Sequence, residues 1–380
     1  EGLSAFRTEG LSHSFCAAFR TEGLSALHSG PRVFSSIPDR GSFCPRSMSV
    51  VHAVSRTTGR NAKKYTYVTT GKIIASQMRM TKAQPVYAGR SLMLTRRIRN
   101  RTFLLRPCKK LSQIIRYIAA VEGAKWHIQI HAIIVMSNHW HLCITDPFGN
   151  VVHFQRDCHT FIARALNTMH GESESIWSST APSRVTCEGP QALLQKIAYT
   201  MANPVKAGLV RYGKSWPGIR QAWPCPPMTI ARPKGFFRGE EDGGEWPESA
   251  TLQFVRPPGF ASDSDEELAV KIAAEVEATE DASRRIYDEG GRKFLGPKRI
   301  RKQRRHSRPS GKETKFQVSP RLACRDVSTR IERLSARKFW LHDYEAALED
   351  WIAGAREVLF PPGTYKMHVV HGARCREFVT

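Results

Sequence analysis

Two histidines, His139 and His141, flank Trp140 in an apolar stretch that runs from Trp126 to Asp146. The stretch pauses at a Ser-Asn pair before it resumes, which predicts two adjacent strands joined by a turn. Side chains two residues apart on a strand point to the same face, so the two imidazoles are expected to project together while Trp140 points away. Neighbouring imidazoles are able to share one metal ion, so the pair is a candidate metal site. On spacing alone, two alternating histidines on a strand are more often surface or core residues than ligands.

Such a pair needs a third ligand from elsewhere in the chain. Cys143 continues the alternation, but it lies about 13 Å from His139 at roughly 3.3 Å per residue, too far to share an ion. Tyr199 and Asn203, in KIAYTMANPV, are four residues apart on one face of a predicted helix. An Asn carbonyl oxygen with two imidazoles leaves positions on a divalent ion for phosphate oxygens, and a Tyr hydroxyl one turn away would reach the phosphorus. Taken singly, each residue also fits a structural role, as a half-buried aromatic and as a helix-end residue before Pro204.

The elements that must position these residues lie within residues 80–225. Apolar residues that recur every three or four positions predict helices, and short apolar runs bounded by turn residues predict strands. The order is strand, helix, strand, strand, helix and a further helix, which matches an α+β fold of the split βαβ type, with an antiparallel sheet and helices packed on one face. The expected elements are a strand over Leu92–Arg97, a helix from Cys108 that Gly123 ends, a helix over Val151–Met169, a long loop over Glu172–Pro190 and a helix from Gln191 that stops at Pro204.

Outside this domain the chain is predicted to be less regular. Residues 1–79 contain the repeat AFRTEGLS, which is too short and too poor in apolar residues to build a core, so a low-complexity, disordered extension or a misassigned start is expected. Residues 226–260 are rich in Pro, Gly and Trp and predict an irregular connector. Residues 261–380 are expected to form a basic linker and a smaller C-terminal α+β module of open role. Its expected elements are a helix over Ser264–Ile286, a helix over Asp343–Leu359 and a strand over Tyr365–Val370.

The charge of the chain restricts its partners. Its 58 Lys and Arg against 34 Asp and Glu give a formal net charge of +24, an excess that favours nucleic acid or an anionic membrane surface. No apolar run reaches the roughly 18 residues that a membrane span requires, so a soluble protein without a membrane partner is expected. The nine cysteines are scattered without a CxxC pair, which is typical of reduced thiols in a cytoplasm.

Two motifs resemble those of a known family. MSNHWHL, Met136–Leu142, resembles the HUH motif (His, hydrophobic, His) of single-tyrosine transposases, and YTMANPVKAGLV, Tyr199–Val210, resembles the Tyr-x-x-x-Asn-Pro-Val element of REP-associated tyrosine transposases. The motifs stand in the family's order, and the resemblance covers about residues 80–220. It implies a ferredoxin-like fold and an endonuclease and strand transferase that acts on single-stranded or hairpin DNA in transposition.

Residue by residue, the resemblance implies that His139, His141 and Asn203 hold Mg²⁺ or Mn²⁺. Tyr199 would be the nucleophile and would form a 5′-phosphotyrosine. A homodimer is compatible with this picture. Two alternatives stay open: a domesticated or decayed DNA-binding protein that keeps the fold but no longer cuts, and an RNA-binding protein, which only the general basic charge favours.

Two basic clusters are the expected DNA contacts, and an ordinary solvated surface is the alternative for each. The first adjoins the first predicted strand, and the second is the run KRIRKQRR. The predicted DNA-binding residues are Arg96, Arg97, Arg99, Arg101, Lys298, Arg299, Arg301, Lys302, Arg304 and Arg305.

Overall fold

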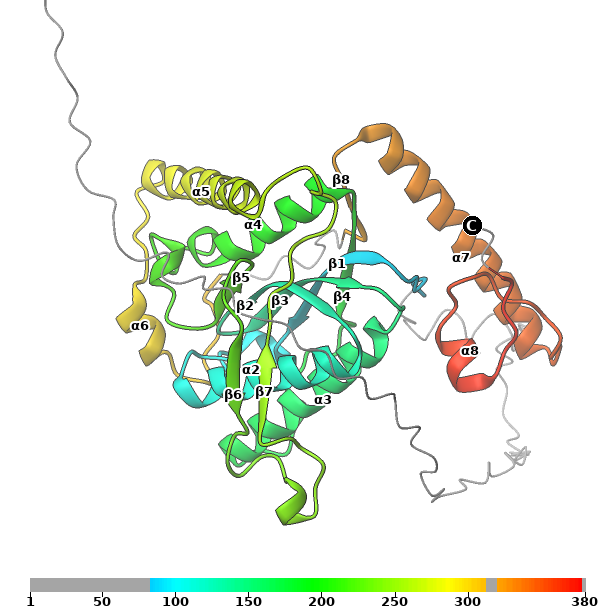
Figure 1. Ribbon diagram of the computed structural model, residues 1–380, viewed down its shortest axis with the longest axis horizontal. Coiled ribbons are helices and arrows are strands. Elements are labelled where there is room, and N and C mark those ends of the chain that lie inside the picture. Colours follow the sequence, from blue (N-terminus) through cyan, green and yellow to red (C-terminus); the bar gives the residue numbers. More distant parts are fainter. Residues whose placement is uncertain (1–82, 312–319, 378–380) are drawn as a thin grey trace, which may run out of the picture. The chain divides into compact units, whose positions relative to one another are not determined.

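Six strands form the central sheet of the computed structural model, which describes residues 83–311 and 320–377 (Figure 1). These residues belong to one unit of the chain, residues 69–380. The strand order is β5-β2-β3-β1-β4-β8, and every neighbouring pair is antiparallel except β4 with β8. The predicted α+β class is confirmed, whereas the extension predicted over residues 1–79 lies outside the described residues. The strands are β1 Arg90–Arg97, β2 Gln129–Val135, β3 His139–Asp146, β4 Ser183–Glu188, β5 Arg220–Ala222 and β8 Leu322–Cys324.

Two helices connect strands that are not neighbours. Helix α2, Lys109–Lys125, joins β1 to β2, and helix α3, Val151–His170, joins β3 to β4. In the sheet, β3 lies between β1 and β2, and β1 lies between β3 and β4. Each crossover therefore spans one intervening strand.

The sheet carries helices on both of its faces, so the prediction that the helices pack on one face is wrong. Alternating side chains of β3 separate the two faces. Trp140 packs against His159 of α3 with 5.8 Å between ring centroids, whereas Cys143 contacts Thr200 of helix α4, Pro190–Lys206. All residues of β3 except the first are buried, so each face requires a cover that excludes water.

Two predicted helix ends are also wrong. Gly123 lies inside α2 and is not one of the glycines with a positive φ, the backbone conformation that would end a helix there. Pro204 lies inside α4, where it lacks only its own amide hydrogen. The amide of Ala207 still donates to the carbonyl oxygen of Asn203 at 2.9 Å, so the helix continues to Lys206.

The segment predicted as a long loop, Glu172–Pro190, contains strand β4. Its buried residues, Val185 and Cys187, alternate with Arg184 and Thr186. With only two buried apolar residues, the alternation of apolar and polar residues in β4 is too short to predict a strand from sequence. The segment is a strand because its backbone pairs with β1.

The residues after α4 pack on the sheet and its helices. The predicted irregular connector contains a hairpin of β6, Met228–Ala231, and β7, Ser249–Leu252, which packs against α2. Helix α5, Asp265–Glu289, packs along α4 (Figure 1). The remaining short elements of residues 83–311 are the helix α6 and three single-turn 3-10 helices, of which η1 lies between β1 and α2. They are α6 Pro297–Lys302, η1 Arg99–Arg101, η2 Gly213–Ser215 and η3 Glu240–Asp242.

The C-terminal segment is helical. Helices α7, Val327–Ile352, and α8, Lys366–His371, surround a small core that includes Phe360 and Met367. The strand predicted over Tyr365–Val370 is therefore wrong: the amide of Val369 donates to the carbonyl oxygen of Tyr365 at 2.8 Å, as in a helix. The α+β character predicted for this module is also wrong, because strand β8 belongs to the central sheet.

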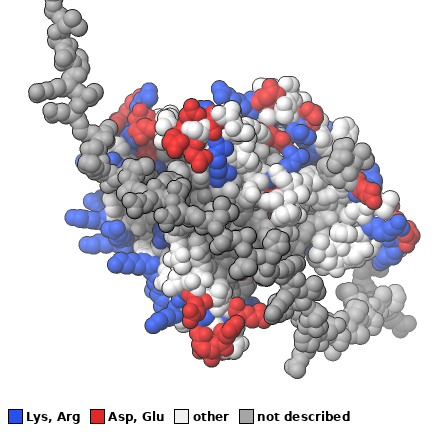
Figure 2. All heavy atoms as spheres, in the orientation of Figure 1, with Lys and Arg blue, Asp and Glu red and all other residues white. Residues whose placement is uncertain are grey.

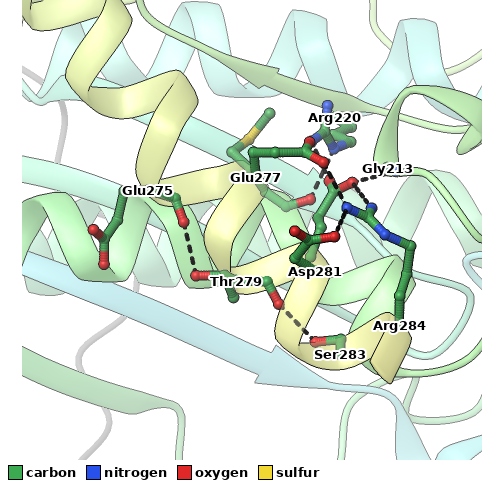
Figure 3. Close-up of polar contacts among 10 residues, drawn as sticks. Gly213, Arg220, Glu275, Glu277, Thr279, Asp281, Ser283 and Arg284 are labelled. Carbon is green, nitrogen blue, oxygen red and sulfur yellow. Dashed lines mark hydrogen bonds and ion pairs between the residues drawn. The ribbon is translucent and has the colours of Figure 1, made fainter. Parts of the chain in front are cut away.

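A buried carboxylate fastens α5 to the elements beside it. Glu280, 4% exposed, accepts hydrogen bonds from Arg220 Nη2 at 2.9 Å and from the amide of Gly213 at 3.0 Å. Figure 3 shows Arg220, Gly213 and Arg284 joined in this network. Because Arg220 Nε also donates to the carbonyl oxygen of Met201 at 2.7 Å, the network ties α5 directly to α4.

We predict that Glu280→Ala lowers the free energy of unfolding by about 3 kcal/mol, since it leaves the Arg220 guanidinium buried without its carboxylate. Urea denaturation followed by circular dichroism measures the loss. Glu277→Ala is the matched control on the same helix, because that side chain is 64% exposed and its removal is expected to cost less than about 1 kcal/mol. Equal losses in the two variants would contradict the anchoring role.

Candidate active site

Strand β3 places the two histidines side by side. The ring centroids of His139 and His141 are 4.8 Å apart, with an angle of 76° between the ring planes. Both project toward α4, while Trp140 between them points to α3. The pairing register with β1 sets Arg97 opposite His139 and Thr95 opposite His141. Both imidazoles therefore lie on one face of β3, as the spacing in the sequence predicts.

Hydrogen bonds orient the two rings. His139 Nδ1 lies 2.7 Å from Asn138 Oδ1, and a carbonyl oxygen only accepts, so Nδ1–H donates and Nε2 keeps its lone pair. His141 Nδ1 lies 2.7 Å from the hydroxyl of Thr95, and its Nε2 faces Asn203. Each ring thus has its Nδ1 held by a protein partner, and the Nε2 of His141 also forms a hydrogen bond, with Asn203 Nδ2 at 3.2 Å. An Nδ1 held in this way is common among metal-bound histidines.

Both histidines are neutral at physiological pH. Burial and, as a smaller contribution, the nearby charge of Arg97 together lower the pKa of His139 to about 4. Burial also holds the pKa of His141 well below its ordinary value, with contributions from His139, Arg97 and Lys196. Neutral imidazole is the form that coordinates a metal, so neither ring has to lose a proton first.

Helix α4 brings the other two predicted site residues to the same place. Asn203 Nδ2 lies 3.2 Å from His141 Nε2, and half a turn of the amide would present Oδ1 to that point instead. The ring centroid of Tyr199 is 5.8 Å from that of His141. The structure therefore brings together all four residues singled out from the sequence: His139, His141, Tyr199 and Asn203.

Two lysines border the tyrosine. The Nζ of Lys206 lies 4.7 Å from the ring centroid of Tyr199, and that of Lys196 lies 5.8 Å away. Burial raises the pKa of the Tyr199 phenol, and the positive charge of Arg97 opposes that rise. The phenol is thus protonated at rest, and the charge of Arg97 favours its ionised form.

Few side chains at this site are able to coordinate a metal ion. Among residues 83–311 and 320–377, no three His, Cys, Asp or Glu side chains are grouped to hold an ion. Cys143 is not a further donor, because burial raises the pKa of its thiol to about 12 and its sulfur contacts Thr200 at 3.4 Å. Two neutral imidazoles and an amide are the donors available, a set that fits a divalent ion with positions left for other ligands.

The first basic cluster is divided between surface and interior. Arg97 is exposed and lies across from His139. Arg96 turns to the other side, where its guanidinium lies over the ring of Trp177 and burial lowers its pKa. Arg99 forms ion pairs with Glu172 and Glu174, and Arg101 Nη1 donates to the carbonyl oxygen of Gly311 at 3.0 Å. Of the four arginines, Arg97 is the one beside the histidines.

The second basic cluster packs beside the turn that precedes His139. Ile300 of α6 is buried in a core cluster with Met136, and Ser137 Oγ donates to Gln303 Oε1 at 2.8 Å. Arg305 contacts the ring of His170. Figure 2 shows Lys and Arg side chains gathered at the edge of the molecule where α6 lies. The exposed members are Lys298, Arg299, Arg301, Lys302 and Arg304.

Sequence reasoning missed the supporting residues. Thr95 and Gln303 could be found only from the strand register and the packing of α6, for which the sequence has no local signal. Lys206 carries such a signal, because seven residues after Tyr199 is two helical turns along the same face.

The comparisons with known proteins add little. No protein-family model matches the chain, and no curated protein matches it. Among solved structures, the chain is similar to one described as "Structure of the REP associates tyrosine transposase bound to a REP hairpin", with 21% sequence identity, coverage of 36% of this chain and 80% of that chain, and a TM-score of 0.31. A likeness at that TM-score carries no argument about function. Among the helices of the described residues, none has the length and apolar content to cross a membrane.

We predict that, in the presence of EDTA, the free energy of unfolding decreases as the pH falls from about 6.5 toward 4. Unfolded histidines bind protons near pH 6.5, whereas folded His139 does not until about pH 4, so protons favour the unfolded chain in this window. Replacing His139 with Asn is expected to remove part of this decrease, as measured by urea denaturation at pH 7 and pH 5. His342→Asn, at a side chain 84% exposed, is expected to leave it unchanged. An identical pH dependence in wild type and the His139 variant would refute the assignment.

Proposed function

We propose that this chain is a single-stranded DNA endonuclease and strand transferase of the single-tyrosine transposase type. The observation that carries the proposal is the meeting of an HxH strand and a Tyr-x-x-x-Asn helix face, with 5.8 Å between the ring centroids of His141 and Tyr199. The element order β1-α2-β2-β3-α3-β4 and the sheet order β2-β3-β1-β4 support the finer proposal that the core is ferredoxin-like.

The donor set supports a divalent cation as cofactor. His139 and His141 through Nε2, with the amide oxygen of Asn203, would hold Mg²⁺ or Mn²⁺. When bound, such an ion stabilises negative charge on the phosphate oxygens during the reaction. Asn138 and Thr95 keep the two imidazoles oriented for this task through their hydrogen bonds to Nδ1.

Tyr199 would be the nucleophile. Its Oη forms a bond to a backbone phosphorus while the bond from phosphorus to the 3′ oxygen breaks, and the phenol proton is balanced by the one that the released 3′-hydroxyl takes up. The product is a 5′-phosphotyrosine. Attack of another 3′-hydroxyl on that phosphorus reverses the step and joins two strands without a nucleotide cofactor. Lys206 and Lys196 would stabilise the phenolate that forms during attack.

The surface around the site supports DNA as the partner. Arg97 lies beside the histidines, and the exposed basic residues of α6 and the segment after it lie along the edge where that helix packs. Arg96, Arg99, Arg101 and Arg305 also contact groups within the protein, so their contribution to DNA binding would be smaller. Single-stranded or hairpin DNA is the proposed substrate, and a homodimer stays a prediction.

A non-cutting DNA-binding protein of the same fold is the second candidate. The observation that favours it is the raised pKa of the Tyr199 phenol, which makes the nucleophile harder to ionise than a tyrosine in water. The two candidates share the basic surface and differ only in whether a covalent adduct forms.

Covalent trapping separates them. A labelled single-stranded oligonucleotide with a hairpin, incubated with the protein and Mn²⁺, is expected to yield an adduct that survives denaturing electrophoresis. Tyr199→Phe is expected to abolish the adduct and to retain the affinity for DNA within about twofold, because only the nucleophilic oxygen is lost. Tyr212→Phe, at a tyrosine 45% exposed, is the matched control and should form the adduct normally. Binding without an adduct in the wild type would favour the non-cutting protein, and an undiminished adduct in Tyr199→Phe would refute the role of Tyr199.

A further inference from the structure

A cavity with five arginines among mostly apolar lining residues lies between the edge of the sheet and α7. It has a volume of about 300 Å³ and is bordered by β4, by the start of β8 and by one face of α7. Five arginines and one glutamate line it: Arg90, Arg184, Arg321, Arg333, Arg337 and Glu188. The cavity is therefore strongly positive.

The glutamate is paired with two of these arginines. Glu188 lies 3.1 Å from Arg90 Nη1 and 3.7 Å from Arg333 Nε. The side chains of the other three, Arg184, Arg321 and Arg337, have no hydrogen bond or ion pair with any residue of the described ranges. These three residues border the cavity, and their guanidinium groups are unpaired within residues 83–311 and 320–377.

The carboxylate whose charge acts on Arg184 is already occupied. Asp146 accepts hydrogen bonds from the amides of Asn150 and Val151 at 2.9 and 2.7 Å, at the start of α3. Burial lowers the pKa of Arg184, and the charge of Arg321 lowers it further. The pKa of Arg337 is lowered in the same way, by burial and then by Arg321. The five arginines of the cavity outnumber its one carboxylate, Glu188, and this excess of like charge destabilises the empty cavity, so an anion would relieve that cost.

A second, larger hollow adjoins the first. It has a volume of about 780 Å³ and shares Arg184 and Arg321 with the first cavity. Gln155 also lines it, and the Nε2 of this buried side chain has no hydrogen-bond partner among residues 83–311 and 320–377. The joined hollows thus offer guanidinium and amide donors, which suit a ligand rich in acceptors. A phosphate group is such a ligand, because its oxygens match the guanidinium fork.

The hollows lie on the opposite face of the sheet from Tyr199. On β4, Arg184 and Thr186 line the first cavity, while the alternating residues Val185 and Cys187 point to the other side. Gln155 belongs to α3, which covers the face away from α4. A ligand in the hollows would therefore not compete with chemistry at Tyr199.

We propose that these joined hollows bind the phosphate backbone of a single nucleic-acid strand, at a second site separate from the histidines and Tyr199. The combined space is far larger than one phosphate, which leaves room for sugar and base units. The choice of a nucleic-acid strand as the phosphate source rests on the proposed function, whereas the preference for phosphate rests on the arginines alone.

Binding without cleavage tests the proposal. Fluorescence anisotropy of a labelled oligothymidylate of about twelve nucleotides is measured in EDTA, so that the result does not depend on whether Tyr199 is active. The double variant Arg184→Gln, Arg337→Gln is expected to bind about tenfold more weakly, because it removes two phosphate-binding charges. The slope of log affinity against log salt is expected to decrease by about 0.7 for each phosphate that the variant no longer neutralises. Lys338→Gln removes a charge from the neighbouring position on α7, outside both hollows, and is expected to change the affinity by less than about twofold.

Thermal unfolding separates lost binding from lost folding. Without ligand, the double variant is expected to melt at the same temperature as the wild type or higher, because charge repulsion is removed. An affinity equal to that of the wild type would overturn the proposal, as would a melting temperature low enough to account for weaker binding. Displacement of the oligonucleotide by millimolar inorganic phosphate would overturn the assignment to a strand. If the wild type forms no adduct at Tyr199 but the arginine double variant still binds the oligonucleotide more weakly, the result counts against the proposed function and not against this second site.

Discussion

The pairing of β1 with β3 is the constraint on which the site depends. The register places Thr95 opposite His141 and Arg97 opposite His139, so β1 supplies both the hydroxyl that orients one ring and the charge that lowers the pKa of both. A slip of one residue would turn the histidines toward α3 and Trp140 toward α4. Burial on both faces of β3 makes such a slip costly, because every side chain after the first would exchange one packed environment for the other.

The second requirement is that α4 keeps its place over that strand. Helix α4 carries Tyr199 and Asn203, and it is held by the sheet on one side and by α5 on the other. The carboxylate of Glu280 and the guanidinium of Arg220 connect α5 to the backbone of α4 at Met201, within one turn of both functional residues. A site shared between a strand and a helix needs this kind of support, since neither element alone fixes the distance between its parts.

Much of this arrangement could be predicted from local patterns. The HxH spacing, the four-residue separation of Tyr199 and Asn203 and the apolar periodicity of α2, α3 and α4 all depend on short stretches of sequence. The face covered by α4 could not be predicted, because an apolar helix pattern does not say which side of a sheet it will cover. Strand β4 and the helical state of residues 366–371 were also beyond local reasoning, since tertiary contacts around Val185 and Phe360 decide them.

The hydrogen bond between Ser137 and Gln303 joins residues 166 positions apart in the chain. Pairing of the neighbouring strands β2 and β3 closes only a short loop of the chain. The Ser137–Gln303 hydrogen bond closes a much longer loop, which costs more conformational entropy. The hairpin that carries the histidines is therefore expected to form early in folding, while the hydrogen bond from the Ser137 side chain is added only when α6 docks. During synthesis, the ribosome must release more than half of the remaining chain before the basic segment can reach the histidine turn. The time at which this site becomes complete is thus set by the order in which the chain emerges.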